Sequence, residues 1–160
     1  MLASPLYGEL VGSEDPLLVL ASTPQRIADL VRGWDASRWS RSYAPGKWTA
    51  ADLMLHLAHD EIAWCSRVRL ALTVDRYAVQ PFDGTEWVAQ EAPVDPEIAL
   101  AAYLTLRRLN LPLYARIPPD RRARPFAHPE FGQISIDWIL RTLAGHDRHH
   151  LGQLQAIAAL

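Results

Sequence analysis

Four long segments of this sequence repeat their apolar residues with the period of an α-helix, and almost none of the chain alternates as a β-strand does. These segments run from about residue 16 to 34, from 49 to 72, from 96 to 116, and from 135 to the end. Amphipathic helices of this length are stable when their apolar faces pack against one another. The sequence therefore predicts an all-α protein built as a four-helix bundle.

The connections between these helices are long. Residues 73–93 contain many turn-forming residues and leave room for one short helix at about residues 85–90. A connection of this length predicts a crossover in the bundle instead of a simple hairpin of helices. Thr49 and Asp52 form a variant of the capping box at the start of the second helix. Within the first helix, Pro24 is expected to kink the helix or to split it into two pieces.

Composition excludes several classes of protein. A chain of 160 residues with 49% hydrophobic and 21% charged residues suits one globular domain, which we place at residues 1–160. A net charge of −2 does not favour nucleic acid as a partner. No segment has the roughly 20 uninterrupted apolar residues of a membrane-spanning helix. With one cysteine and no leader-like start, the sequence predicts a cytoplasmic protein without a membrane partner.

Two histidines stand on the apolar side of the last helix. On a helical wheel His150 lies about 40° from His146, at the edge of the stripe that carries Ile139 and Leu143. Buried histidines need hydrogen-bond partners or a metal ion. A spacing of four residues sets both imidazoles on one face, as two metal ligands from one helix require. His149 points to the side of this line.

A metal held by protein normally needs a third ligand, which we expect on another helix. His56 in "LMLHLAHDE" lies at the margin of an apolar stripe and shares its line with Asp60 and Arg67. His59 is displaced from this line, toward solvent or an interface. For each histidine taken alone, a core residue that is simply hydrogen-bonded is the alternative.

Four pieces of the chain resemble the DinB/YfiT-like superfamily. They are "GKWTAADLMLHLAHDE", "PFDGTEWVAQ", "HPEFGQISIDWIL" and "HDRHHLGQLQAI", in the family's order, over most of the chain from Pro45 onward. The resemblance implies a four-helix bundle, often a homodimer, whose histidine triad binds a divalent ion. On this chain it implies His56, His146 and His150 as metal ligands. Nickel and zinc are the first candidates, and iron, manganese and copper are further ones.

One position departs from the family's pattern. His59 stands where an acidic residue is common after the first ligand. This departure concerns the residues around the ligands, because a carboxylate beside a metal-bound histidine orients the ring and raises its basicity. Asp60 and Asp147 are candidates for this role, and Gln153 is a polar neighbour at the edge of the site. A solvated helix surface is the alternative for all three.

Three protein ligands leave the fourth position of a metal ion open, which is typical of a catalytic site. An ion there can acidify a bound water molecule or bind a thiol. Members of the resembling family look like metal-dependent hydrolases or transfer low-molecular-weight thiols such as bacillithiol and mycothiol. We expect thiol transfer to a small-molecule substrate, because such thiols carry carboxylates that arginine can bind. The arginines in question lie around the third helix and the loop after it: Arg107, Arg108, Arg121, Arg122 and Arg124.

Two other functions stay open. The chain is alternatively a metal-dependent hydrolase or a stress-response protein that binds metal without catalysis. A substrate-sized pocket beside the three histidines would favour an enzyme, and a metal capped by side chains would favour binding alone. No catalytic residue is assigned. Cys65 is rejected as a nucleophile because it lies on the side of its helix opposite His56.

Some apolar side chains are left over once each helix has turned one face inward. Leu55 and Ile62 on the second helix and Trp138 on the fourth lie well off the metal-facing stripes. Exposed apolar patches tend to mark interfaces, so the sequence predicts a symmetric homodimer.

Overall fold

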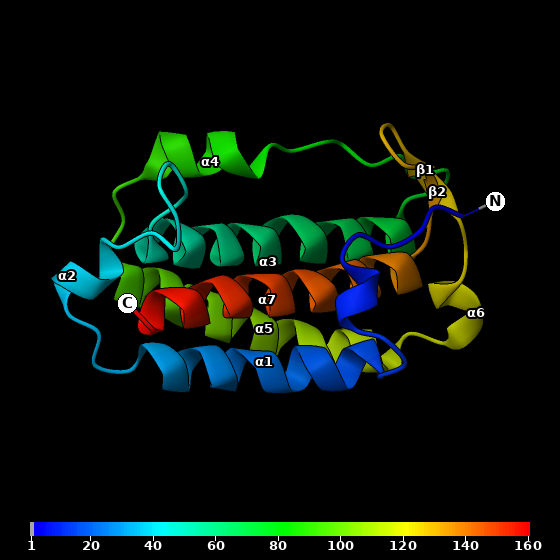
Figure 1. The fold of residues 1–160 in the computed structure, drawn as a ribbon. Helices are drawn as coiled ribbons and strands as arrows, with labels where there is room; N and C mark the ends of the chain where they lie inside the picture. The colour runs from blue at the N-terminus through cyan, green and yellow to red at the C-terminus, as the bar shows by residue number, and fades with distance from the viewer. Residues whose placement is uncertain (1) are drawn as a thin grey trace.

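The structure is a computed structural model, it describes residues 2–160, and it contains four long helices (Figure 1). These helices are α1 (Pro16–Val31), α3 (Ala50–Thr73), α5 (Pro96–Arg116) and α7 (Ile136–Ala158). They lie side by side as a bundle, with α3 packed on α5 and α7, and α1 packed on α5 and α7. The predicted four-helix bundle is confirmed.

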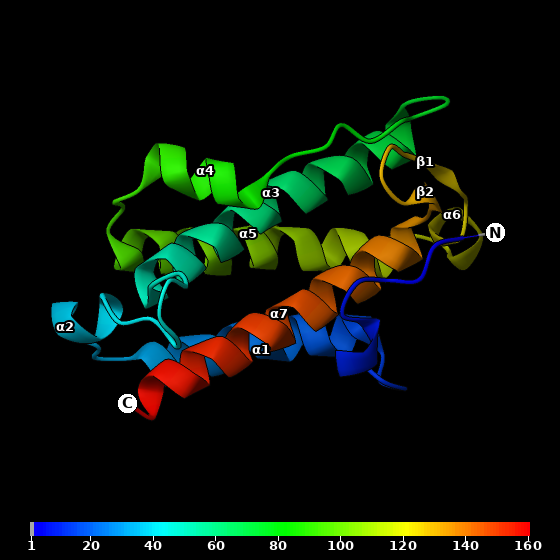
Figure 2. The same ribbon diagram turned by 45° about the horizontal axis from the view of Figure 1, so that its top comes forward.

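The order of the helices explains the long connection after α3. In Figure 1, α3 and α5 run in one direction, while α1 and α7 run in the opposite direction. Because α3 and α5 are parallel, the chain must return along the whole length of the bundle between them. The returning segment includes α4 (Gly84–Glu91), which lies along the outside of α3. Figure 2 shows the pair α3 and α5 above the pair α1 and α7. The predicted crossover and its short helix are confirmed.

Side-chain caps fix the starts of the long helices. The Thr49 hydroxyl accepts a hydrogen bond from Asp52 N at 3.2 Å, and Asp52 Oδ2 accepts one from Thr49 N at 3.0 Å. This reciprocal pair is the expected capping box, and its N-cap residue, Thr49, lies seven residues before His56. Ser135 caps α7 through a single bond, with its hydroxyl accepting from Trp138 N at 3.2 Å.

Pro24 was expected either to kink the first helix or to split it into two pieces. It does not split the helix. The helix α1 continues unbroken through this residue. A proline leaves the carbonyl four residues earlier without its helical donor, and here that carbonyl belongs to Leu20. Arg107 Nη1 donates to Leu20 O at 3.0 Å and replaces the missing bond. The sequence pattern could not reveal this donor, because it comes from another helix.

Several short elements were not anticipated from the sequence. They are the 3-10 helix η1 (Gly8–Leu10), α2 (Ala36–Trp39), α6 (Pro119–Arg122), and a hairpin of β1 (Phe126–His128) and β2 (Gly132–Ile134). The two strands pair antiparallel, with Phe126 opposite Ile134 and His128 opposite Gly132. Three residues are too few for an alternating pattern to stand out in a sequence.

A buried ion network joins three of the helices in the core. Arg107 on α5 donates to Glu61 Oε1 at 2.8 Å through Nε and to Asp147 Oδ2 at 2.7 Å through Nη1. Asn110 Nδ2 donates to Glu61 Oε2 at 3.0 Å, and the Tyr103 hydroxyl donates to Asp147 Oδ2 at 3.1 Å. All five side chains are buried. The network therefore ties α3, α5 and α7 together.

The described residues contain no helix that is both long enough and apolar enough to cross a lipid bilayer.

Candidate metal centre

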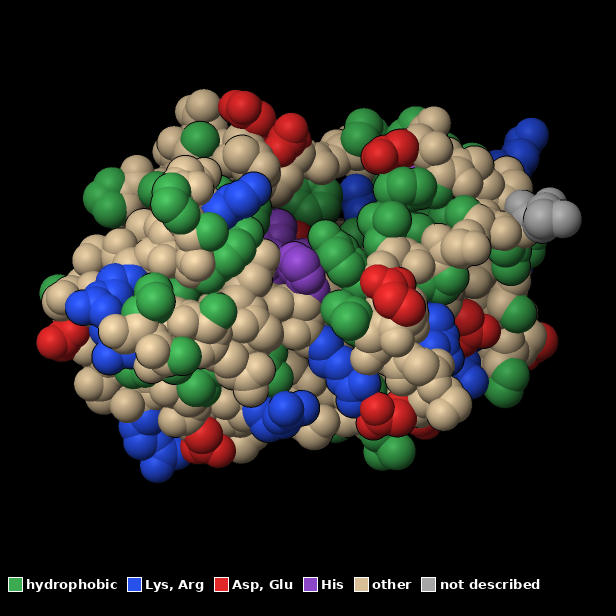
Figure 3. All heavy atoms as spheres, in the orientation of Figure 1, with side chains coloured by type: hydrophobic (Ala, Val, Ile, Leu, Met, Phe, Trp, Pro, Cys, Tyr) green, Lys and Arg blue, Asp and Glu red, His purple; other side chains and the backbone are tan. Residues whose placement is uncertain are grey.

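Three histidines meet between α3 and α7. His146 Nε2 lies 2.9 Å from His56 Nε2 and 2.9 Å from His150 Nε2. The three rings each offer one nitrogen atom, and these three nitrogens all lie within 4.8 Å of one another. Each residue is at most 8% exposed, and histidine side chains are visible in a hollow near the middle of the face in Figure 3. The structure thus brings together the three residues that the sequence singled out.

The geometry and charge of this cluster fit a divalent ion. Two imidazole nitrogens at about 2.1 Å from one ion lie about 3.0 to 3.4 Å apart for bond angles of about 90° to 109°. The two measured separations of 2.9 Å need only a small adjustment to meet this range. Burial lowers the pKa of His56, His146 and His150. The imidazoles are therefore neutral at physiological pH, which is the form that binds a metal.

Gln153 orients one of the three rings. The His150 Nδ1–H donates to Gln153 Oε1 at 2.6 Å, which leaves His150 Nε2 without a proton and facing the cluster. The amide nitrogen of Gln153 lies 3.1 Å from His149 Nε2 and can donate to it. Gln153 therefore lies where the sequence placed it, at the edge of the site, and it selects the tautomer of His150 that a metal requires.

Asp60 brings a carboxylate to the cluster. Its Oδ2 lies 3.2 Å from His146 Nε2, and its Oδ1 lies 4.0 Å from His56 Nδ1. Trp64 Nε1 donates to Oδ2 at 3.2 Å, while Oδ1 is buried and has no hydrogen-bond partner among the described residues. Burial raises the pKa of Asp60, against the opposing influence of His56.

Asp147 does not take the role that the sequence offered it. Both of its carboxylate oxygens bond to Arg107, and Tyr103 donates to one of them. It therefore belongs to the buried ion network instead of standing beside a ligand ring. Since Asp147 directly follows His146, the network fixes the backbone of α7 at the level of the cluster.

The other two nearby histidines lie outside the cluster. His59 is 3% exposed, and its Nε2 lies 2.9 Å from Glu91 Oε2. Of the two positions expected for His59, solvent or an interface, the first is wrong, because α4 covers this side of α3, with the Trp87 ring 5.4 Å from the imidazole. His149 stacks on the ring of Tyr7 at 4.7 Å between centroids.

A cavity of about 460 Å³ opens beside the three histidines. Its wall includes Trp48, whose ring centroid lies 4.7 Å from that of His56, together with Lys47, Phe82 and Tyr7. The volume falls in the range of about 300 to 1,000 Å³ that small-molecule sites occupy. The cluster is therefore open to a small molecule on one side.

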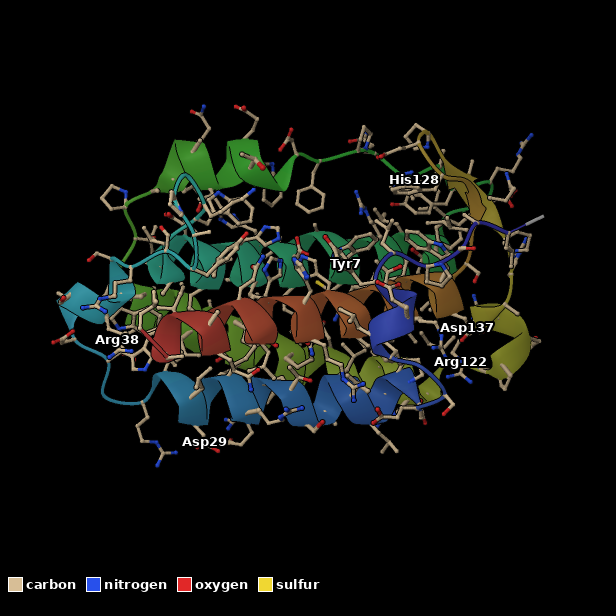
Figure 4. All side chains as sticks on the ribbon, in the orientation of Figure 1. Tyr7, Asp29, Arg38, Arg122, His128 and Asp137 are labelled. Carbon is tan, nitrogen blue, oxygen red and sulfur yellow. The ribbon has the colours of Figure 1, made fainter. Side chains whose placement is uncertain are left out.

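The contribution of the N-terminal segment was missed from the sequence. Tyr7 precedes η1 and lies in front of α7 in Figure 4. A Cβ atom on Gly145 would lie 2.1 Å from the carbonyl oxygen of Tyr7, so only glycine allows this approach. An isolated glycine inside the helical pattern of the last helix was the signal that could have indicated such a contact.

The arginines that the sequence grouped together do not form one surface near the cluster. Arg107 is internal, Arg121 donates to the Leu72 carbonyl, and Arg122 pairs with Asp137. Figure 4 shows Arg122 and Asp137 at the end of the bundle, away from Tyr7. Sequence proximity misled here because the side chains of a helix and of the following loop point in different directions.

Cys65 makes no contact with the cluster. Its thiol donates to the Ile62 carbonyl at 3.4 Å on the outer side of α3. This position agrees with its rejection as a nucleophile.

The fold and the cluster together define a class, that of four-helix bundles in which histidines from two helices form a potential metal site beside a cavity. The chain belongs to the DinB superfamily, whose family model matches residues 20–154. Two curated relatives from Oceanobacillus iheyensis bear the names "Putative metal-dependent hydrolase OB0782" and "Putative metal-dependent hydrolase OB0413". The first is 28% identical over 84% of this chain and 78% of its own length. The second is 27% identical over 81% and 76%.

Solved structures share the fold. YfiT from Bacillus subtilis, described as "a probable metal-dependent hydrolase with an unusual four-helix bundle topology", matches with a TM-score of 0.83 and 24% identity, over 90% of this chain and 84% of YfiT. A mycothiol-dependent maleylpyruvate isomerase matches with a TM-score of 0.71 and 16% identity, over 87% of this chain and 59% of that one. At these identities the likeness concerns the fold alone.

Proposed function

We propose that this chain is a metal-dependent hydrolase of small-molecule substrates, with His56, His146 and His150 as the metal ligands. The observation that carries the proposal is the cavity of about 460 Å³ that reaches the three buried histidines. A site that only stores or senses a metal has no need of space for a substrate. The names of the relatives support hydrolysis as the reaction.

A divalent ion at this position supplies Lewis acidity, which polarises a substrate carbonyl group and makes water more acidic. Nickel or zinc is the ion we expect, since neutral imidazoles suit both. The residues of the chain supply the rest. To Asp60 Oδ2, which accepts a hydrogen bond from the indole N–H of Trp64, we assign the role of accepting the proton of an attacking water molecule. Trp48 and Phe82 line the cavity and limit the access of bulk water.

Thiol transfer, which we expected from the sequence, has lost its main argument. That expectation depended on a surface of arginines that would hold the carboxylates of the thiol. Arg107 instead forms ion pairs with Glu61 and Asp147 in the core. Thiol transfer therefore becomes an outcome of the activity test instead of the first choice.

Assembly as a homodimer stays a prediction. Of the three apolar residues that suggested an interface, only one is exposed in the structure. Leu55 and Trp138 are buried within the chain, so they are not available for an interface. Ile62 is 45% exposed and lies on the same helix as the exposed Leu70, and the exposed Val74 directly follows that helix. Light scattering over a concentration series measures the mass directly, and a monomer persisting into the micromolar range would contradict the dimer.

The activity is tested with metal-loaded protein. We expect cleavage of members of a panel of small esters and amides, lost on chelation and in His146→Ala, and reduced in Asp60→Asn. Gln155→Leu, an exposed change on the same helix as His146, is the matched control and should keep the activity. Conjugation of bacillithiol, mycothiol or glutathione to monochlorobimane, lost with the metal, would move the assignment to thiol transfer. Equal behaviour of wild type and His146→Ala in every assay would contradict a metal-dependent enzyme.

A further inference from the structure

A second charged side chain lies close to the cluster and is not used by the proposed chemistry. Arg67 is on α3, seven residues after Asp60, and is only 6% exposed. Its guanidinium carbon lies 4.4 Å from the ring centroid of Trp64 and 5.0 Å from that of Phe82. The cation is thus held between two aromatic rings, an arrangement that fixes its position.

In the part of the chain that the structure describes, Arg67 has no carboxylate within ion-pair distance, and the carboxylate whose charge stabilises it from farther away is that of Asp60. The one hydrogen bond that Arg67 makes there runs from Nη2 to the Gln80 carbonyl at 3.1 Å, and no carboxylate forms an ion pair with it. Arg107, the other deeply buried arginine, has two carboxylate partners. A buried charge without a direct ion pair is incompletely compensated, so an anion from outside the chain would be stabilised beside it.

The remaining donors of Arg67 are not completely buried. None of its nitrogens is among the buried atoms that lack a hydrogen-bond partner, so Nε and Nη1 are not sealed inside the protein. Arg67 lines a second cavity of about 540 Å³, together with the apolar side chains of Ile62, Leu70 and Val74. A ligand in this cavity can reach the guanidinium.

Phe82 belongs to the walls of both cavities, and Trp64 lines the one beside the histidines. The guanidinium lies between these two rings. Trp64 also donates to Asp60 Oδ2, which is 3.2 Å from His146 Nε2. Trp64 therefore contacts both Arg67 and Asp60, the residue beside the proposed reaction site. The hollow in Figure 3 contains histidine, hydrophobic and basic surfaces close together.

We propose that Arg67 binds a carboxylate group of the substrate and makes the site specific for small carboxylic acids. This proposal rests on the proposed function, because the same molecule would present its reacting group to the histidine cluster. A single planar guanidinium matches one planar carboxylate in charge and shape. The apolar second cavity accommodates a hydrocarbon body next to that carboxylate.

The competing explanation is structural. Arg67 would then only clamp the returning segment onto α3 through Gln80 and Phe82. That role accounts for one hydrogen bond and one ring contact, but it gives no reason for a buried guanidinium without a direct ion pair in the wall of a cavity. The two explanations differ in what Arg67 does to the choice of ligand.

Calorimetric titration of the metal-loaded protein with benzoate and with benzamide tests the proposal. The two probes have the same ring, and only benzoate carries a negative charge. Wild type should bind benzoate about tenfold or more tightly than benzamide. Arg67→Gln should remove this preference, and Arg67→Lys should keep part of it. Arg76→Gln is the matched control, because the Arg76 side chain is 94% exposed, and it should leave the preference unchanged.

Several outcomes would overturn the proposal. The first is a wild type that does not prefer benzoate, a result that needs no variant to fold. The second is a preference that survives Arg67→Gln and disappears in His146→Ala, because the carboxylate then binds the metal ion. The third is an Arg67→Gln protein with a lower melting temperature and an unchanged preference, as the structural role predicts. If the protein cleaves no ester or amide, the proposed hydrolase function is contradicted. The benzoate titration is a separate test and would still show whether Arg67 binds a carboxylate.

Discussion

His56 Nε2 and His146 Nε2 lie 2.9 Å apart although 90 positions separate the two residues in the chain. Packing of α3 against α7 brings them together. Both side chains are at most 8% exposed, and a buried imidazole without a partner is costly. The pair, with His150 beside it, is best explained as a site kept for a metal ion.

Loss of the Gln153 amide should weaken metal binding. Gln153→Leu removes the acceptor for the His150 Nδ1–H, so the tautomer and orientation of that ring are no longer selected. We expect the affinity for zinc to fall by about 10- to 100-fold, measured by competition with a chelating dye. Gln155→Leu makes the same change on the exposed side of the helix and should leave the affinity unaltered. Equal affinities of the two variants would show that Gln153 has no such role.

A methyl group on Gly84 should disturb His56. The Cβ of an alanine there would lie 2.8 Å from Cε1 and 2.9 Å from Nδ1 of the His56 ring. Either the ring or α4 must move, and we expect metal affinity to fall about tenfold. Gly152→Ala is the control, since nothing lies within 4 Å of its Cβ position, and it should stabilise α7 by about 0.5–1 kcal/mol. Unchanged metal affinity in Gly84→Ala would be evidence against a fixed His56 ring.

Removal of the Arg107 charge should strongly destabilise the fold. Arg107→Met leaves Glu61 and Asp147 buried without a cation, which costs about 3–5 kcal/mol of the free energy of unfolding. Arg108→Met alters the exposed neighbour on the same helix and should stay within about 0.5 kcal/mol of wild type. Urea unfolding followed by circular dichroism measures both. A loss below about 1 kcal/mol in Arg107→Met would mean that the network contributes little.

Much of the fold could be predicted because its signals are local. The period of the apolar residues, the Thr49 capping box and the length of the connection after α3 each depend on neighbours in sequence. The same periodicity placed His56, His146 and His150 on inward faces, since a helix turns spacing into direction. Pairing of the two helices then followed from the need to bury those faces.

The errors concern side chains whose partners come from distant segments. Arg107 read as a surface charge because Glu61 and Asp147 lie 46 and 40 residues away. His59 was placed toward solvent or an interface because the helix that covers it, α4, belongs to the returning segment. Leu55 and Trp138 read as leftover apolar surface for the same reason. A helical wheel gives the direction of a side chain, but not what the rest of the chain places there.

Metal content is the most direct test of the central claim, that His56, His146 and His150 hold one divalent ion. Protein purified without a histidine tag, loaded with zinc or nickel and freed of excess ion, is measured by element analysis. The account predicts one ion per chain in wild type and in His59→Ala, whose side chain lies outside the cluster, and a loss of the ion in His146→Ala. Circular dichroism checks that the variants are folded. Equal metal content in His146→Ala and wild type would contradict the account.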